Sequence, residues 1–156
     1  MRTTAQFSSK IFSQDPKVPH LWSSTNLSNF SVSEDSQNIK ADGCSLELSD
    51  DGKTYHIKST NSKTSIVDLK FTQVAPGLVV GKDGTSYYGT DPKKPWGRIL
   101  HQFWPRCKVE GQILTQEGPV NFNGLGMASL ALQGMKPHFA GMQSPVATRG
   151  NGLLIA

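Results

Sequence analysis

The four histidines are the residues that could most readily do acid–base or metal chemistry at neutral pH. His20, His56, His101 and His138 are far apart in the sequence, and no two of them have the spacing of metal ligands. The chain contains neither the GxSxG motif of a nucleophilic serine nor the HExxH motif of a zinc hydrolase. We therefore predict no catalytic residue, no metal site and no cofactor, and we interpret the protein as a non-enzyme.

The surroundings of the histidines differ. His56 alternates with apolar neighbours in a strand-like stretch, which predicts that its side chain faces solvent. His101 and His138 lie in aromatic and methionine-containing surroundings. Each of these two residues fits either a structural role or a general acid–base role in an apolar pocket, and the missing catalytic motifs favour the structural role.

Aromatic residues are concentrated between Trp96 and Arg106, where two of the three tryptophans occur with a phenylalanine, a histidine and two arginines. This composition is typical of a barrel wall in which an arginine stacks on a ring. It is equally typical of a pocket wall made of apolar rings and a few fixed polar groups. A second candidate segment, residues 133–138, contains an adaptable methionine. The candidate ligand-binding residues are Trp96, His101, Phe103, Trp104, Arg106, Met135 and His138.

The two cysteines, Cys44 and Cys107, show no CxxC spacing. Each lies in a strand-like run, where a free cysteine usually behaves as a small buried hydrophobic residue. A disulfide between them stays open as an alternative.

Charge and hydropathy restrict the class of partner. The formal net charge is +4, but the basic residues are scattered, with Lys93-Lys94 as the doublet. A nucleic-acid-binding protein usually gathers its basic residues on one face, so we expect no nucleic-acid partner. Weak attraction to anionic membranes fits the charge as well. The first twelve residues lack the apolar core of a signal peptide, and no stretch is apolar enough for a membrane-spanning helix, which predicts a cytoplasmic protein.

The elements that would position these residues are short strands. The alternation of Cys44, Leu46 and Leu48, followed by an Asp51-Gly52 turn and then by Tyr55 and Ile57, predicts a hairpin with a tight primed turn. Residues 67–74 repeat the pattern, with Val67, Leu69 and Phe71 facing inward. Residues 81–95 are interpreted as a loop, and the polar stretch 21–29 is ambiguous. Further strands are expected at 5–12, 30–32, 99–104, 107–114, 120–122 and 125–132, although the last of these could also form a helical turn.

This pattern of short strands separated by turns predicts an all-β sandwich or barrel. The 15 glycines and 9 prolines agree with the many turns that such a fold needs. From about residue 142 the alternation is lost, and we expect a disordered tail there.

Several motifs together resemble the fungal survival factor 1 family. They are PWGRILHQFWPRCKVEGQI (residues 95–113), LQGMKPH (132–138), DDGKTYHIKS (50–59) and Tyr87-Tyr88-Gly89. The resemblance runs from about Thr3 to Gly141. The positions that match the family signature are Trp96, His101, Trp104, Arg106 and His138.

The resemblance implies a lipocalin-like, calycin-type antiparallel barrel or sheet. Family members have two such domains, so the chain is expected to be an incomplete N-terminal domain (residues 1–141) followed by a divergent tail (residues 142–156). The implied function is binding and non-vesicular transfer of a ceramide-like lipid, linked to sphingolipid metabolism and survival of oxidative stress. The implied location is the cytoplasm with peripheral contact at endoplasmic reticulum and Golgi membranes, and the nucleus is a further compartment.

The chain also departs from the family. Family members are longer, begin with a membrane-binding amphipathic helix, and continue into a second β domain. We therefore expect a shortened chain whose sheet lacks strands and has exposed edges. Two alternatives remain: an enzyme of the related hydratase or pericyclase type that uses His101 or His138, and an inactive truncated fragment. The oligomeric state and the ligand stay open.

Overall fold

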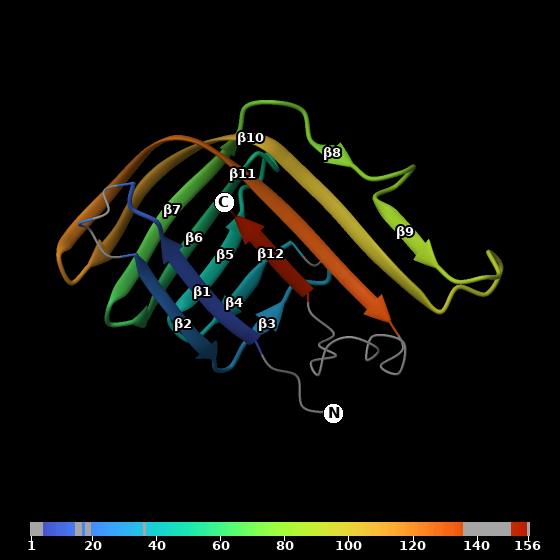
Figure 1. The fold of residues 1–156 in the computed structure, drawn as a ribbon, viewed down its shortest axis with the longest axis horizontal. Coiled ribbons are helices and arrows are strands. Elements are labelled where there is room, and N and C mark those ends of the chain that lie inside the picture. Colours follow the sequence, from blue (N-terminus) through green and yellow to red (C-terminus); the bar gives the residue numbers. More distant parts are fainter. Residues whose placement is uncertain (1–4, 15–16, 18–19, 36, 136–150, 156) are drawn as a thin grey trace. The chain divides into compact units, whose positions relative to one another are not determined.

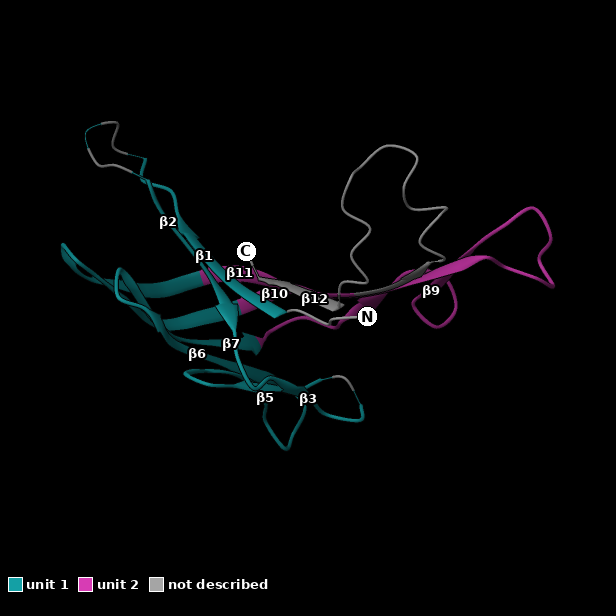
Figure 2. Cartoon of the chain, turned by 90° about the horizontal axis from the view of Figure 1, so that it is seen from below, with its two compact units in different colours: residues 1–72, 108–124 teal, residues 73–107, 125–156 magenta. Residues whose placement is uncertain are grey.

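The computed structural model describes residues 5–14, 17, 20–35, 37–135 and 151–155, and every regular element in these ranges is a β-strand (Figure 1). The chain divides into two compact units. Unit 1 consists of residues 1–72 and 108–124, and unit 2 consists of residues 73–107 and 125–156 (Figure 2). The expectation of an all-β protein is therefore confirmed.

The sheet of unit 1 follows the strand order β11-β10-β7-β6-β5-β4-β3, and the pairs from β3 to β7 are antiparallel. Its strands are β3 (Ser31–Val32), β4 (Ile39–Ala41), β5 (Cys44–Leu48), β6 (Thr54–Ser62), β7 (Ser65–Gln73), and the parts within this unit of β10 (Gly97–Thr115) and β11 (Gly118–Met135). Its end strands, β3 and β11, do not pair with each other in the described residues. The sheet is therefore open, which agrees with the expected incomplete lipocalin-like sheet.

The predicted hairpin is confirmed as β5 and β6, with Leu46 opposite Ile57. Its turn differs from the prediction. A primed two-residue turn needs positive φ at its first central position, but Gly52 (φ +67°) is positive and Asp51 is not. The loop is longer instead: the Ser49 N–H donates to the Thr54 carbonyl over 2.8 Å. The Asp51 carboxylate accepts the Ser49 hydroxyl, and this hydrogen bond lowers the pKa of Asp51.

The core of unit 1 lies on one face of this sheet. The inward side chains predicted from alternation are buried, with relative exposures between 4% and 8%: Tyr55, Ile57, Val67, Leu69 and Phe71. Val109 and Ile113 of β10 are buried as well. Burying such a side chain stabilises a fold by about 1.5–3 kcal/mol, so these residues hold unit 1 together.

The polar stretch that was ambiguous in the sequence forms a strand. β1 (Ala5–Ile11) pairs antiparallel with β2 (Leu21–Leu27) in a separate two-stranded sheet. Serine hydroxyls connect the two strands, Ser8 to Ser24 over 2.8 Å and Ser9 to Ser23 over 3.0 Å. The hairpin was not predicted because residues 21–29 are rich in serine and show little apolar alternation. Cross-strand pairs, including the serine pairs, stabilise it instead.

In unit 2, β10 carries two short strands that the sequence interpretation missed. β8 (Leu78–Val79) pairs with Gln102–Phe103, and β9 (Thr85–Tyr88) pairs with Gly97–Leu100. The interpretation of residues 81–95 as a loop is therefore wrong at β9. The glycine and aspartate residues on both sides of β9 are typical of loops, so the sequence did not indicate a strand there. Backbone pairing with β10 stabilises β9.

Two pairs of predicted strands are single strands. The predicted break at Pro105-Arg106 is wrong, because β10 continues through both residues. Both side chains are exposed, and a proline is tolerated in a strand where its missing N–H costs no ladder bond. Residues 120–122 and 125–132 likewise belong to one strand, β11, and do not form a helical turn.

β12 (Asn151–Ile155) pairs antiparallel with residues 128–132 of β11. It belongs to the segment for which a disordered tail was predicted, and residues 136–150 lie outside the described residues. The division into a domain ending at residue 141 and a tail stays a prediction. The described part of the chain contains no helix long and apolar enough to cross a membrane.

Gly111 provides a direct test of the β7–β10 pairing. Its φ of +127° lies in the region that favours glycine, and a Cβ there would collide with the Asp68 carbonyl oxygen and lie 3.1 Å from the Leu69 Cα. We expect Gly111→Ala to reduce the free energy of unfolding by about 2 kcal/mol or more. The measurement is a denaturant titration followed by circular dichroism.

Gly124→Ala is the matched control, since a Cβ at Gly124 meets no atom within 4 Å and no positive φ is found there. This variant should leave stability within about 0.5 kcal/mol of the original. Equal stability of the two variants would contradict the described backbone at Gly111.

Cys107 reports on the core of unit 2. Its side chain is fully buried, with 0% relative exposure, whereas Cys44 is half-buried, and both thiols are free. Burial raises the pKa of both thiols, so their different exposure, rather than their thiolate fraction, distinguishes their reactivity. We expect pulse alkylation at pH 8, mapped by mass spectrometry, to modify Cys44 first and Cys107 only when denaturant is added. Faster modification of Cys107 than of Cys44 in the native chain would show that this core does not form.

Candidate functional site

The predicted aromatic segment occupies the first half of β10 and the residue before it. Trp96, His101, Phe103 and Trp104 are half-buried, and Arg106 is exposed. The segment lies in unit 2, where β8 and β9 both pair with it. Met135 ends β11, but its side chain is outside the described residues, as is all of His138. Four of the seven candidate residues therefore lie in β10, and Trp96 immediately precedes it.

Trp96 is fixed by its contacts with β9. Its backbone N–H donates to the Tyr88 carbonyl over 2.9 Å. Its ring stacks on the Tyr88 ring, with centroids 5.8 Å apart and planes 25° apart. Stacked aromatic pairs of this kind are worth about 0.5–1.5 kcal/mol beyond their buried area. The Tyr87-Tyr88 motif and Trp96 belong to two separate sequence motifs, and this pairing places them in contact.

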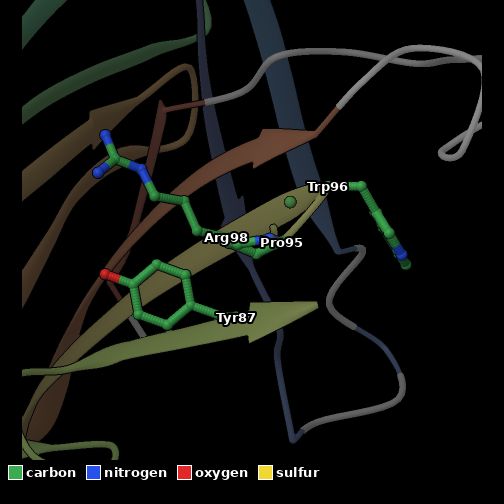
Figure 3. Close-up of a pocket in the computed structure, with 5 residues that line it drawn as sticks. Tyr87, Pro95, Trp96 and Arg98 are labelled. Atoms are coloured by element: carbon green, nitrogen blue, oxygen red, sulfur yellow. The ribbon is translucent and has the colours of Figure 1, made fainter. Parts of the chain in front are cut away.

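An open pocket of about 220 Å³ lies beside this stack. It is lined by Tyr87, Pro95, Trp96, Gly97 and Arg98 (Figure 3). Arg98 lies directly opposite Tyr87 in the β9–β10 register, and their side chains extend to the same side, whereas the Trp96 ring extends away from them (Figure 3). The pocket thus combines aromatic and prolyl surface with a cationic guanidinium.

The size of this pocket limits what it can hold. Ligand pockets commonly measure about 300–1,000 Å³, so 220 Å³ suits a small polar or ring-like fragment rather than a whole two-chain lipid. Of the candidate residues, Trp96 lines this pocket. Tyr87, Pro95 and Arg98 also line it, although the sequence analysis did not name them as ligand-binding residues. The Tyr87-Tyr88 motif could have indicated these residues, but the sequence does not show that it pairs with the start of β10.

His101 ties the β8–β9 connection to β10 through its backbone. Its N–H donates to the Gly84 carbonyl over 2.8 Å, and its carbonyl accepts the Val80 N–H over 3.4 Å. Gly84 has φ +86°, and a Cβ there would lie 2.9 Å from Leu100 Cδ1. The His101 ring lies 5.7 Å from the Phe103 ring, centroid to centroid. The hydrogen bonds use the backbone of His101, so a structural role for its imidazole stays a prediction.

An exposed apolar strip runs next to Phe103. Leu78, opposite Phe103 in the register, is 59% exposed, and the following Val79 and Val80 are 50% and 40% exposed. Three consecutive exposed aliphatic residues are unusual, because an exposed strand normally alternates with polar side chains. The strip offers apolar surface beside the aromatic segment.

A polar cavity in unit 1 was missed by the sequence analysis. His56 Nε2 donates to Asp68 Oδ1 over 2.6 Å, and the His56 side chain is 27% exposed. His56 therefore faces outward between buried Tyr55 and Ile57, as predicted, but its side chain is only partly exposed. The two residues line an open cavity of about 590 Å³ with Lys70, Glu110, Gly111, Gln112 and Asn121. Asp68 lies diagonally across the β6–β7 register from His56, and this register could not be read from the sequence.

Within the described ranges, no group of three or more His, Cys, Asp or Glu residues could hold a metal ion. The polar cavity has His56, Asp68 and Glu110 among its lining residues, together with a lysine and two amides. These outward-facing side chains come from four neighbouring strands. Polar side chains are also what the solvated face of an antiparallel sheet is expected to carry.

Comparison with known proteins identifies the family. The model of the Svf1 family matches residues 1–143. A ceramide-binding protein svf1 of Aspergillus fumigatus is 52% identical over 140 residues, which cover 90% of this chain and 35% of the relative. A ceramide-binding protein svf-1 of Neurospora crassa is 51% identical over 140 residues, or 90% of this chain and 37% of the relative.

A ceramide-binding protein SVF1 of Candida albicans is 45% identical over 142 residues, which cover 90% of this chain and 36% of the relative. The chain thus spans little more than a third of the length of these relatives. No solved structure matches it significantly. The resemblance seen in the motifs is confirmed, because the family match extends over residues 1–143: the chain belongs to the Svf1 family.

Proposed function

We propose that this chain is a lipid-binding module that binds a ceramide-like lipid through the aromatic segment of unit 2. The observation that carries the proposal is the identity of 52% over 90% of the chain with a protein named as ceramide-binding. Binding and release break no covalent bond, so the role needs neither a cofactor nor a catalytic residue. It therefore agrees with the absence of catalytic motifs from the sequence.

The geometry of unit 2 suggests how such a lipid would lie. The 220 Å³ pocket would take the small polar amide-and-hydroxyl head, with Arg98 as hydrogen-bond donor and the rings of Tyr87 and Trp96 as apolar contacts. The exposed strip of Leu78, Val79 and Val80, which lies next to Phe103, would contact part of an acyl chain. Removing acyl surface from water is favourable by about 25 cal/mol per Å², so the strip would contribute affinity and the pocket would contribute selectivity.

The wider role is proposed on the same basis. A protein that binds ceramide reversibly can carry it between membranes without vesicles, with peripheral contact at the endoplasmic reticulum and Golgi. We place this activity in the cytoplasm and connect it with sphingolipid metabolism and survival of oxidative stress. The whole relatives are longer, so the present chain would supply one part of that activity.

Ceramide in a mild detergent should raise the thermal midpoint of the chain. A ligand that binds only the folded state stabilises it by mass action, by about 2.7 kcal/mol when its free concentration is 100 times Kd. We expect a clear upward shift with ceramide and none with phosphatidylcholine in the same detergent. The measurement is a melt followed by circular dichroism, which does not depend on the tryptophans.

Variants locate the effect. Trp96→Ala and Arg98→Ala should each weaken ceramide binding, because truncating a residue that anchors a ligand costs about 2 kcal/mol, or roughly 30-fold. Trp22→Ala is the matched tryptophan control, since Trp22 is 73% exposed and belongs to unit 1. The proposal fails if ceramide does not move the midpoint, and the assigned site fails if Trp22→Ala weakens binding as much as Trp96→Ala.

A further inference from the structure

The β1–β2 hairpin of unit 1 exposes two large aromatic side chains at one end. Phe12, which follows β1, is 66% exposed, and Trp22 in β2 is 73% exposed. Lys10 lies opposite Trp22 in the register, with its Nζ 4.5 Å from the Phe12 ring centroid and 5.8 Å from that of Trp22. The His20 ring meets the Phe12 ring edge-on, with centroids 5.2 Å apart. We call these four residues the hairpin-tip cluster.

The cluster is held in place by polar contacts behind it. The Ser9 hydroxyl contacts the Ser23 hydroxyl across the hairpin and the Ser65 hydroxyl of β7 over 2.7 Å. These bonds connect the hairpin to the main sheet of unit 1. Both rings of the cluster are largely exposed, so they contribute little to the buried core.

The chemistry of the cluster matches the headgroup region of a lipid bilayer. Tryptophan is enriched at membrane–water interfaces, where its ring is apolar and its N–H is hydrated. A lysine beside it can bury its methylene stem and direct its ammonium group to lipid phosphates. Between residues 10 and 22, Lys10 and Lys17 are positive and Asp15 is negative, so the segment carries a small positive charge. Two largely exposed rings beside a lysine, in a segment of small positive charge, fit the surface of an anionic membrane.

We propose that the hairpin-tip cluster docks the chain on anionic membranes by inserting Phe12 and Trp22 among the lipid headgroups. The inference rests on the proposed function, because a ceramide carrier must reach a membrane in order to load and unload its lipid. It adds a defined membrane-contact surface, in unit 1, to the ceramide site proposed in unit 2. Lys10 gives the contact its preference for negatively charged lipid.

Vesicle flotation tests this proposal with the full chain. Vesicles of phosphatidylcholine and phosphatidylserine should bind the chain more tightly than vesicles of phosphatidylcholine alone. Trp22→Ala and Phe12→Ala should each weaken binding about tenfold. Lys10→Gln should weaken binding about fivefold, and only to the anionic vesicles, with the difference disappearing at high salt. Leu125→Ala is the control, because Leu125 is 69% exposed in unit 2, and it should leave binding unchanged.

A second readout follows the depth of insertion. Lipids brominated near the headgroup should quench part of the tryptophan fluorescence, and Trp22→Ala should remove that quenched part. The proposal is overturned if Trp22→Ala and Phe12→Ala bind vesicles like the original, or if Leu125→Ala is equally impaired. It is also overturned if Trp22 drives self-association or capture of another protein while vesicles do not bind.

The two proposals can fail separately. Trp22→Ala should keep the ceramide-dependent rise of the thermal midpoint in detergent, because the aromatic segment of unit 2 is unchanged. Vesicle binding that depends on Trp22 without any ceramide effect would support the hairpin-tip cluster and contradict the ceramide site. A ceramide effect without vesicle binding would support the ceramide site and contradict the membrane contact of the hairpin-tip cluster.

Discussion

The backbone pairing of β10 is the constraint on which the rest of the structure depends. In unit 1 this strand pairs with β7 and β11, and it contributes Val109 and Ile113 to the core. In unit 2 it pairs with β8 and β9 and so forms the candidate site. A strand of this length has to pass Pro105 without losing its ladder and has to approach β7 closely at Gly111. Both Pro105 and Gly111 lie inside this strand, and the pairing of β10 continues past each of them.

The candidate site is a consequence of this pairing rather than of any single reactive group. β9 brings Tyr87 and Tyr88 beside Arg98 and Trp96, and β8 brings Leu78 beside Phe103. Neither group would form a binding surface alone, because each strand is too short to be stable by itself. The result is a small aromatic pocket and an apolar strip, the surfaces on which the proposed lipid site depends. The backbone of His101 holds the β8–β9 connection through two hydrogen bonds.

The sequence predicts strands most reliably where apolar and polar residues alternate and where the paired strands are adjacent in the chain. The β5–β6 hairpin and the inward faces of β7 follow from the spacing of Leu46, Ile57 and Leu69, because such local pairs need no knowledge of register. β9 and the His56–Asp68 contact could not be predicted, since each depends on which strands pair and in which register. The aromatic segment was recognised from its composition, but its partners from β9 were not, for the same reason.

The claim that a ceramide-like lipid binds at the β9–β10 site is tested most directly by photo-crosslinking. A photoactivatable ceramide is added to the folded chain in mild detergent, irradiated, and mapped by mass spectrometry of peptides. The account predicts crosslinks within residues 78–104, reduced by excess unlabelled ceramide and by Trp96→Ala. Crosslinks confined to residues 5–62, or crosslinks that unlabelled ceramide does not reduce, would contradict it.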